Sequence, residues 1–338
     1  MNARDATIRA FRRPEPPPEG EYASLADAAV DVLSSEPPDL RPQDIRGLPG
    51  GLIRLDTGLP TIVVPDLHAR RDFFISLMES PLPEGGTVRD ALAVGALQIL
   101  CLGDGFHAES RALDRWQEAY LEFLGGWRKR DAMDQEMAES MGLMEMVMLA
   151  KLAYPGHFHF LKGNHENVLN EEGDGNHPFR KFVLEGEMVR SYLERFYGDD
   201  FLERYAAFEK ALPLFAVGAR FLASHAEPER PYSDAELVNA RLSNEVILGL
   251  TWTDNGAAEP GSVTSLLSRM LPDVKRPRYF TGHRVISGLY RERSSGYHLQ
   301  IHNPGKFVVA WALPDRDFKP ERDIGELRDL SGELSEPR

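Results

Sequence analysis

The chain contains five short fragments whose side chains are typical metal ligands. The fragments are Pro65-Asp66-Leu67-His68, Gly103-Asp104-Gly105, Gly163-Asn164-His165-Glu166, Ser224-His225-Ala226 and Gly282-His283-Arg284. Together they offer two carboxylates, one amide oxygen and three imidazoles, from Asp66, His68, Asp104, Asn164, His225 and His283. A mixed oxygen and nitrogen set suits borderline divalent metals such as Mn, Fe or Zn, whereas Mg or Ca sites use oxygen almost exclusively.

Six ligands are too many for a single catalytic metal that must keep one coordination position open. They suit two metals if one carboxylate bridges them, and Asp104 is the natural bridge. Two ions about 3.5–4 Å apart can share a water, lower its pKa and clamp the oxygens of an in-line phosphoryl displacement. The leaving oxygen then needs a proton, and His165, next to Asn164, is placed to supply it as a general acid. The fragments therefore predict a two-metal hydrolase.

Each fragment follows a segment with the pattern of a buried or half-buried strand. The expected strands are residues 52–55, 61–64, 97–102, 157–161, a hairpin over 214–223 that turns at Gly218, 279–281, 298–301 and 307–311. The last two strands are joined by the turn Asn303-Pro304-Gly305. Polar residues therefore gather at strand carboxyl ends, which is where open α/β sheets place their sites.

Helical patterns fill most of the remaining chain. The expected helices are residues 24–33, 72–78, 179–211 and 234–248, with a helical insertion over about 110–153 that is split at Gly125-Gly126. The second half of this insertion carries a methionine-rich face, formed by Met133, Met137, Met141, Met144, Met146 and Met148. Such a face either packs in the core, which is the commoner use of methionine, or lines a groove for a partner or substrate.

The order of these elements predicts the fold class. Strands alternate with helices early and short strands dominate late, so we expect an α/β (α+β) fold with central β-sheets, arranged as a two-sheet sandwich flanked by helices. Residues 1–22 are rich in proline and charge and are expected to form an extended, disordered arm. Residues 23–318 then form one domain that includes the insertion, and residues 319–338 form a loosely held, charged tail.

The composition is that of a folded globular protein. The 338 residues are 42% hydrophobic and 27% charged, and the net charge is −14, which argues against a nucleic-acid-binding surface. Cys101 is the single cysteine and cannot form an intramolecular disulfide. The N-terminus lacks the apolar segment of a signal peptide, and no run approaches the roughly 20 apolar residues of a membrane span. We expect a cytoplasmic protein with no membrane or nucleic-acid partner, whose oligomeric state stays open.

The fragments resemble the motifs of the calcineurin-like metallophosphoesterase superfamily, whose order is D-x-H, GD, GNH(E), H and then GH or AH. The single histidine of Gly282-His283-Arg284, and a segment Leu250-Thr251-Trp252-Thr253-Asp254 that looks like W-[ST]-D, are similar to the phosphoprotein phosphatase (PPP) branch. The resemblance runs from about residue 61 to 311.

The resemblance implies a metal centre with two divalent ions, for which Mn is the first expectation and Fe or Zn the alternatives. By this resemblance one metal takes Asp66, His68 and Asp104, and the other takes Asp104, Asn164, His225 and His283. It also implies that a hydroxide bridging the metals attacks phosphorus and that His165 is the general acid.

The second fragment departs from the family pattern GDxVDRG. His107 stands at the Asp position and Ala108 at the Arg position, so the usual phosphate clamp is missing, and Lys162 replaces an Arg before GNHE. The nearest candidates in sequence for binding the substrate phosphate are Arg70, Arg71 and Arg284. Both Glu109 and His107 stay open as the residue that orients His165.

Three functional hypotheses follow from these observations. The first is a phosphomonoesterase, with phosphoserine or phosphothreonine on a protein as the substrate that the family implies. The second is a nucleotide or phosphodiester hydrolase of the same fold, because the arginine is missing and the insertion could wall off a small pocket. The third is a binding homologue without catalysis. Isolated histidines are more often structural or incidental than ligands, and we apply that expectation to His157, His159, His177, His298 and His302.

Overall fold

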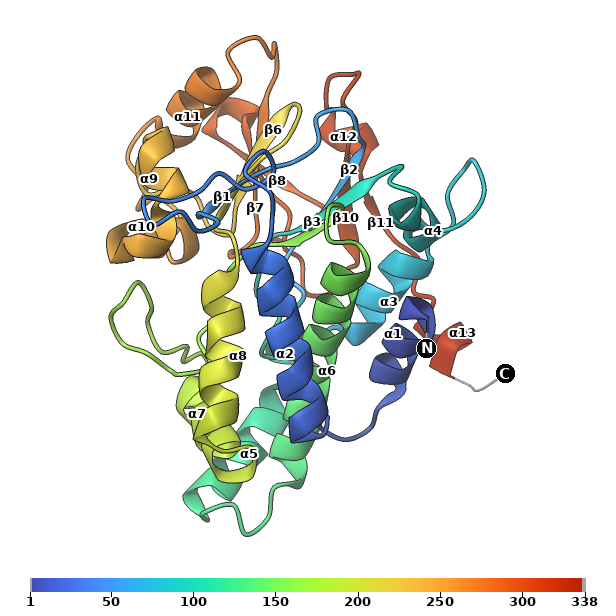
Figure 1. Ribbon diagram of the computed structural model, residues 1–338, viewed down its shortest axis with the longest axis vertical. Helices are drawn as coiled ribbons and strands as arrows, with labels where there is room; N and C mark the ends of the chain where they lie inside the picture. Colours follow the sequence, from blue (N-terminus) through green and yellow to red (C-terminus); the bar gives the residue numbers. More distant parts are fainter. Residues whose placement is uncertain (1, 336–338) are drawn as a thin grey trace.

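The computed structural model describes residues 2–335, which form two β-sheets packed face to face with helices around them (Figure 1). One sheet has five strands in the order β11-β10-β2-β3-β4, and the other has six in the order β1-β5-β6-β7-β9-β8. The strands are β1 (Leu52–Arg54), β2 (Thr61–Val64), β3 (Gln98–Cys101), β4 (Phe158–Phe160), β5 (Phe215–Val217), β6 (Phe221–Ser224), β7 (Arg278–Thr281), β8 (Arg291–Arg293), β9 (His298–Gln300), β10 (Val308–Ala312) and β11 (Ile324–Glu326). The predicted α/β class with a two-sheet sandwich is confirmed.

The central strands are apolar throughout because both of their faces are buried. On β2, Val63 packs between the sheets with Leu299 and Phe280. Its neighbours Ile62 and Val64 point to the opposite side, into a core shared with the helices. The alternation of side chains along a strand thus places one core between the sheets and a second core under the helices.

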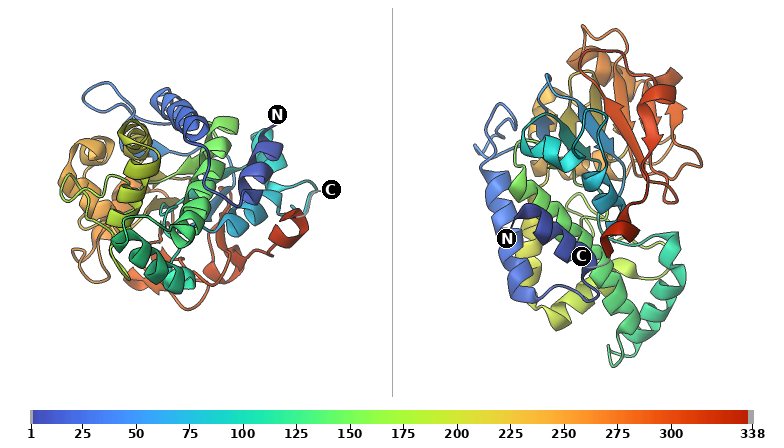
Figure 2. Two further views of the ribbon diagram at one scale, coloured as in Figure 1. Left: turned by 90° about the horizontal axis from the view of Figure 1, so that it is seen from below. Right: turned by 90° about the vertical axis from the view of Figure 1, so that its right-hand side faces the viewer.

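A large helical layer packs on the five-stranded sheet and extends well beyond it (Figures 1 and 2). It contains α2 (Glu19–Ser34), α3 (Arg71–Glu79), α4 (Val88–Ala93), α5 (Leu113–Leu124), α6 (Asp131–Ala153), α7 (Glu185–Phe196) and α8 (Asp199–Ala211). The six-stranded sheet is covered on its outer face by α9 (Asp234–Val238), α10 (Asn244–Thr251) and α11 (Ser262–Met270). Among residues 2–335, none of the helices has the length and hydropathy that crossing a bilayer requires.

The methionine-rich face of the insertion belongs to the core. All six of its methionines lie on α6 and are at most 1% exposed. Helix α6 is enclosed because α2, α3 and α5 all pack against it. The face is therefore used for packing and does not line a groove.

Both chain ends are more ordered than the sequence predicts. Residues 3–12 of the predicted arm form α1 (Ala3–Arg12), which packs against α6 and lies beside α13 (Ser331–Ser335). In the predicted tail, α12 (Pro320–Asp323) leads into β11, which pairs with β10; residues 336–338 lie outside the described residues. The extended arm is thus wrong for residues 3–12, because their order comes from contacts with distant helices and not from their own composition.

The last two predicted strands are present but do not pair with each other. β9 lies in the six-stranded sheet and β10 in the five-stranded sheet. The turn Asn303-Pro304-Gly305 between them therefore carries the chain from one sheet to the other. The predicted helix over 234–248 is also interrupted, since α9 ends at Val238 and Ser243 caps a new helix.

A buried charge cluster ties α2 and α6 to the loop before β1. Glu36 accepts hydrogen bonds from Arg41 at 2.8 Å and from Lys151 at 2.6 Å, and all three side chains are at most 7% exposed. Removing one partner of such a cluster leaves the others charged, buried and uncompensated.

We therefore expect Glu36→Ala to lower the free energy of unfolding by about 3–5 kcal/mol, measured by urea denaturation. As a matched control, Glu245 makes an exposed ion pair with Arg230, and Glu245→Ala should cost at most about 1 kcal/mol. Equal effects of the two substitutions would contradict this assignment.

Candidate metal centre

The side chains of the five fragments meet where strands of both sheets end. In the five-stranded sheet β2, β3 and β4 are parallel neighbours, and in the six-stranded sheet β6 and β7 are parallel neighbours. The residues that follow these strands are, in that order, Asp66 with His68, Asp104, Asn164 with His165, His225, and His283. Parallel strands end at the same edge of a sheet, so two sets of carboxyl ends converge on one place.

A first group of ligands surrounds His68. Its Nε2 lies 3.6 Å from Asp104 Oδ2 and 3.9 Å from Asp66 Oδ2. Its Nδ1 lies 3.1 Å from the carbonyl oxygen of His107. A proton on Nδ1, donated to this carbonyl, leaves Nε2 as a free lone pair that faces the two carboxylates.

A second group of ligands surrounds Asn164. Its Oδ1 lies 2.9 Å from His225 Nε2 and 2.9 Å from His283 Nδ1. His225 Nε2 also lies 3.4 Å from Asp104 Oδ2. Asp104 Oδ2 therefore faces both groups, which is the position that a bridging carboxylate needs.

These separations fit divalent metal ions. Two ligand atoms that each lie about 2.1 Å from one ion are separated by about 3.0 to 4.2 Å, depending on the angle at the metal. The distances around His68 and from His225 to Asp104 fall in this range. In addition, Asp66 Oδ1 and His283 Nε2 are buried and have no hydrogen-bond partner within residues 2–335. Buried polar atoms are rarely left without a partner, so the donor set fits two divalent ions.

The glycines that precede three of the ligands are needed for close approach. A Cβ on Gly163 would collide with Asp104 Oδ1, and a Cβ on Gly282 would collide with Asp66 Oδ1. His68, Asp104 and His283 themselves adopt left-handed backbone conformations, with φ of 42°, 52° and 57°. Non-glycine residues rarely adopt this conformation and do so mainly at functional sites.

Burial dominates the electrostatics of the site. It lowers the pKa values of His68 and His283 well below the ordinary value, so both imidazoles are neutral and able to bind metal. Burial raises the pKa of Asp66, whose ionised form would therefore gain from a neighbouring cation. For His225, burial alone would lower the pKa, but Asp104 and Asp66 outweigh it and raise the pKa to about 9.

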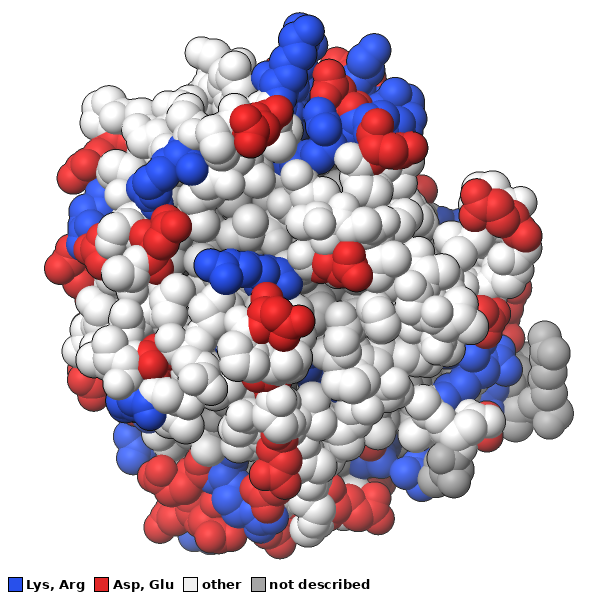
Figure 3. Space-filling view, turned by 45° about the horizontal axis from the view of Figure 1, so that its top comes forward, with Lys and Arg blue, Asp and Glu red and all other residues white. Residues whose placement is uncertain are grey.

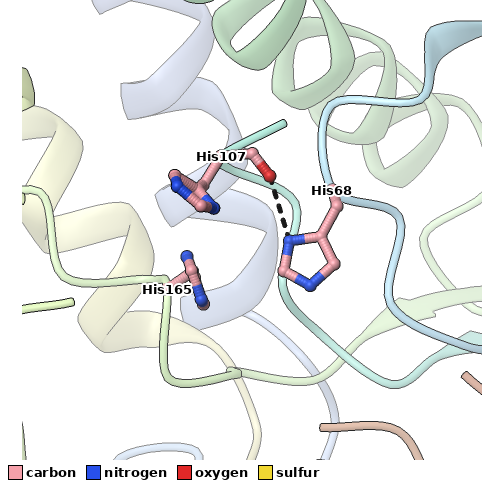
Figure 4. A group of neighbouring side chains, drawn as sticks. All are labelled: His68, His107 and His165. Carbon is pink, nitrogen blue, oxygen red and sulfur yellow. Dashed lines mark hydrogen bonds between the residues drawn. The ribbon is translucent and has the colours of Figure 1, made fainter. Parts of the chain in front are cut away.

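His165 lies beside His107 (Figure 4) and packs against Phe179. Its ring centroid is 4.9 Å from that of His107 and 4.7 Å from that of Phe179. His107 Nε2 in turn lies 3.6 Å from Glu185 Oε1, and Glu185 is fully buried. Burial lowers the pKa of His165 to about 4 although Asp104 beside it acts in the opposite direction. A second proton on this ring at neutral pH therefore requires a further anion nearby, such as a bound phosphate.

Of the two candidates for orienting His165, His107 lies beside it, whereas within residues 2–335 no hydrogen bond or ion pair joins Glu109 to it. Glu109 instead accepts hydrogen bonds from His302 Nε2 at 3.0 Å and from Lys181 Nζ at 2.5 Å. The sequence interpretation overlooked His302, which is 1% exposed and belongs to the site, not to the incidental histidines. The sequence does contain a signal for His302, because this histidine follows a strand, as the predicted ligands do, and Asn303 comes after it.

The three arginines predicted to bind the substrate phosphate make other contacts. Arg71 donates to the carbonyl oxygen of Arg13 at 2.7 Å, and Arg284 pairs with Asp254 at 2.9 Å. Arg70 is 4% exposed. Its guanidinium donates to the backbone carbonyls of Leu67, Asp66, Asn303, Pro304 and Lys306. Through these contacts Arg70 joins the loop that carries Asp66 and Leu67 to the loop that carries Asn303.

Comparison with known proteins identifies the fold. No protein-family model and no curated protein matches the sequence. Among solved structures, the chain is similar to a protein serine/threonine phosphatase from Saccharomyces cerevisiae that is described as similar to human phosphatase PP5. The TM-score is 0.59 and the identity 14%, over 93% of this chain and 91% of that one.

Two further similarities are weaker. One is to a cold-active protein tyrosine phosphatase, with a TM-score of 0.45 and 12% identity over 89% of this chain and 83% of that one. The other is to a protein described as a diadenosine tetraphosphatase, with a TM-score of 0.40 and 14% identity over 82% of this chain and 97% of that one. The likeness to the yeast structure concerns the fold alone: the chain folds like that phosphatase, with the two sheets flanked by helices that the sequence predicts.

Proposed function

We propose that the chain is a dimetal-dependent phosphoric ester hydrolase that acts as a PPP-like serine/threonine phosphomonoesterase. The observation that carries this proposal is the position of Asp104 Oδ2, which lies 3.6 Å from His68 and 3.4 Å from His225. These histidines come from different sheets and belong to the two ligand groups. In this proposal Asp66, His68 and Asp104 hold one ion, and Asp104, Asn164, His225 and His283 hold the other.

Divalent ions held there would activate a water as the nucleophile and neutralise phosphate oxygens. Mn is the first choice, with Fe or Zn as alternatives. Residues of the chain itself protonate the leaving oxygen and position the residue that supplies the proton. His165 Nε2 lies 3.8 Å from Asp104 Oδ2 and its side chain is 11% exposed, so it can reach a bound ester and protonate the leaving oxygen. His107 is the positioning residue for His165, because it lies beside the ring and is itself held near Glu185.

A pocket beside the first ligand group indicates the size of the reacting group. It has a volume of about 260 Å³ and is lined by His68, Arg70, Glu109, Ser110, Arg111, Pro304 and Gly305. Drug-sized ligands usually occupy 300–1,000 Å³. A phosphate on a side chain fits this space. Arg111 lines the pocket and pairs with Glu139 at 2.7 Å, and in this proposal its guanidinium also contacts the phosphate in place of the missing clamp.

The surface around the sandwich carries mixed charges. On the face shown in Figure 3, Lys and Arg side chains alternate with Asp and Glu, and the middle of the face is mostly uncharged. The net charge is −14. These features give no support to a nucleic acid as substrate.

The proposal predicts a metal-dependent preference among substrates. With added Mn, the pure protein should hydrolyse a phosphoserine peptide at least about tenfold faster than bis-p-nitrophenyl phosphate or a dinucleotide, and chelation should remove the activity. Phosphate release measures all three reactions. Faster cleavage of the diester or dinucleotide would support the alternative, a nucleotide or phosphodiester hydrolase. No metal-dependent turnover of any substrate would favour a binding homologue.

A further inference from the structure

His302 occupies a position equivalent to those of the predicted ligands. In the six-stranded sheet, β9 is the parallel neighbour of β7, just as β7 is the parallel neighbour of β6. His225 follows β6, His283 follows β7, and His302 follows β9. The second sheet therefore presents polar residues from adjacent parallel strands in the same way as the first sheet does.

The ring of His302 points into the first ligand group. Its Nδ1 lies 3.8 Å from Asp66 Oδ2, and its ring centroid is 5.2 Å from that of His68. One ligand atom from each of Asp66, His68 and His302 lies within 4.8 Å of the others. His302 Nδ1 is buried and has no hydrogen-bond partner in the part of the chain that the structure describes. An unpaired buried nitrogen between two predicted ligands needs a partner of its own.

The other ring nitrogen shows which atom carries the proton. Because His302 Nε2 lies 3.0 Å from Glu109 Oε2, it carries the proton and donates it to the carboxylate. Nδ1 is then the bare lone pair. A carboxylate that accepts from one nitrogen of a histidine while the other nitrogen faces a metal is the usual arrangement in metal sites, and it fixes both the tautomer and the ring.

Two basic side chains hold this arrangement in place. Lys181 Nζ binds the second oxygen of Glu109 at 2.5 Å. Arg70 donates to Leu67 on the loop that carries His68 and to Asn303 on the loop that carries His302. The two loops are thus fastened to each other, which accounts for the burial of Arg70 without any contact to substrate.

We propose that His302 is a ligand of the metal held by Asp66, His68 and Asp104, and that Glu109 is the residue that orients it. This assignment rests on the metal centre of the proposed function but not on hydrolysis. A second imidazole makes the first site richer in nitrogen than the resemblance implies. With two imidazoles the first site equals the second site, which has His225 and His283, in its number of nitrogen ligands. Nitrogen-rich sites favour Zn or Fe over Mn, so His302 would shift the metal preference of the first site towards Zn or Fe.

The experiment is a titration of the metal-free protein with Zn²⁺ by calorimetry, together with visible absorption spectra of the Co²⁺ form. His302→Gln should weaken one of two binding events by at least about tenfold and change the Co²⁺ spectrum. Glu109→Gln, which leaves all direct ligands in place, should weaken the same event by about 10- to 100-fold or less.

His298 provides a matched control. It lies on β9, the strand that precedes His302, is fully buried, and has its Nδ1 3.6 Å from Glu227, but it is not among the site histidines. His298→Gln should leave both binding events unchanged within about twofold. Circular dichroism shows whether each variant is folded, and Glu109→Gln tests the assignment if His302→Gln does not fold.

The outcomes separate this assignment from the proposed function. Unchanged Zn²⁺ binding and Co²⁺ spectra in both His302→Gln and Glu109→Gln would overturn the role of His302 while leaving the proposed hydrolase intact. A wild-type protein that binds no metal would overturn both. A specific loss of one binding event in a protein that hydrolyses no ester would support His302 as a ligand and end the proposed function.

Discussion

Asp104→Asn should reduce metal-dependent phosphate release by about 1,000-fold or more. The substitution keeps the shape of the side chain, and Oδ1 can still accept the hydrogen bond that the His165 N–H donates at 2.9 Å. It removes the negative charge from the atom that faces His68, His165 and His225. Metal-ion catalysis supplies several kcal/mol of charge stabilisation, and each 1.36 kcal/mol is a factor of ten in rate.

The measurement is kcat/KM with a phosphoserine peptide, together with the metal content of the purified variant. Both ions should be lost or strongly weakened, since Asp104 serves both groups. Asp315 is exposed and is not among the predicted ligands, so Asp315→Asn is the matched control and should retain wild-type activity. A rate for Asp104→Asn within tenfold of wild type would refute the bridging role.

His165→Gln should lower kcat by about 100- to 10,000-fold while both metals remain bound. The ring lies beside His107 and Phe179 but is not among the predicted metal ligands, and its Nδ1 is buried without a hydrogen-bond partner among the described residues. Its proposed task is to protonate the leaving oxygen. The loss should therefore depend on how much the leaving group needs a proton.

Comparing two substrates tests this dependence. The loss should be large for a phosphoserine peptide, whose alkoxide leaves poorly, and much smaller for p-nitrophenyl phosphate, whose phenolate leaves without a proton. His177→Gln is a suitable control, because the side chain of His177 is 49% exposed and pairs only with Glu172 among the recorded ion pairs. Equal losses on both substrates would show that His165 positions the site and does not act as an acid.

The sequence predicts most of the site because local patterns encode it. Asp66, Asp104 and Asn164 each stand directly after a short apolar strand, and parallel strands bring their ends together whatever the rest of the chain does. The glycines before Asp104, Asn164 and His283 also mark the site in the sequence. Glycine is needed at these positions because a carboxylate or backbone approaches closely and leaves no space for a side chain. The fold class, and the gathering of the predicted ligands and His165 in one place, are therefore accessible without a structure.

Long-range contacts account for what the sequence does not predict. His302 belongs to the site because β9 pairs beside β7, a choice of partner that no local pattern specifies. Arg70 looks like a phosphate ligand from its place in the chain, yet it binds the loop around Asn303, 233 residues away. Helix α1 likewise depends on α6 for its order. In each case the deciding interaction joins residues that are distant in sequence.

The origin of the predicted ligands in two different sheets would link the supply of metal to the stability of the protein. Asp66, His68 and Asp104 belong to one sheet and His225 and His283 to the other, so no unfolded chain presents the same set of donors. Ions bound between the sheets would join the two sheets and so stabilise the folded state. At a free concentration 100 times its dissociation constant, each ion adds about 2.7 kcal/mol to the folded state. In a metal-poor cell such a protein would lose abundance as well as activity, because the same ions would serve both its chemistry and its protection from degradation.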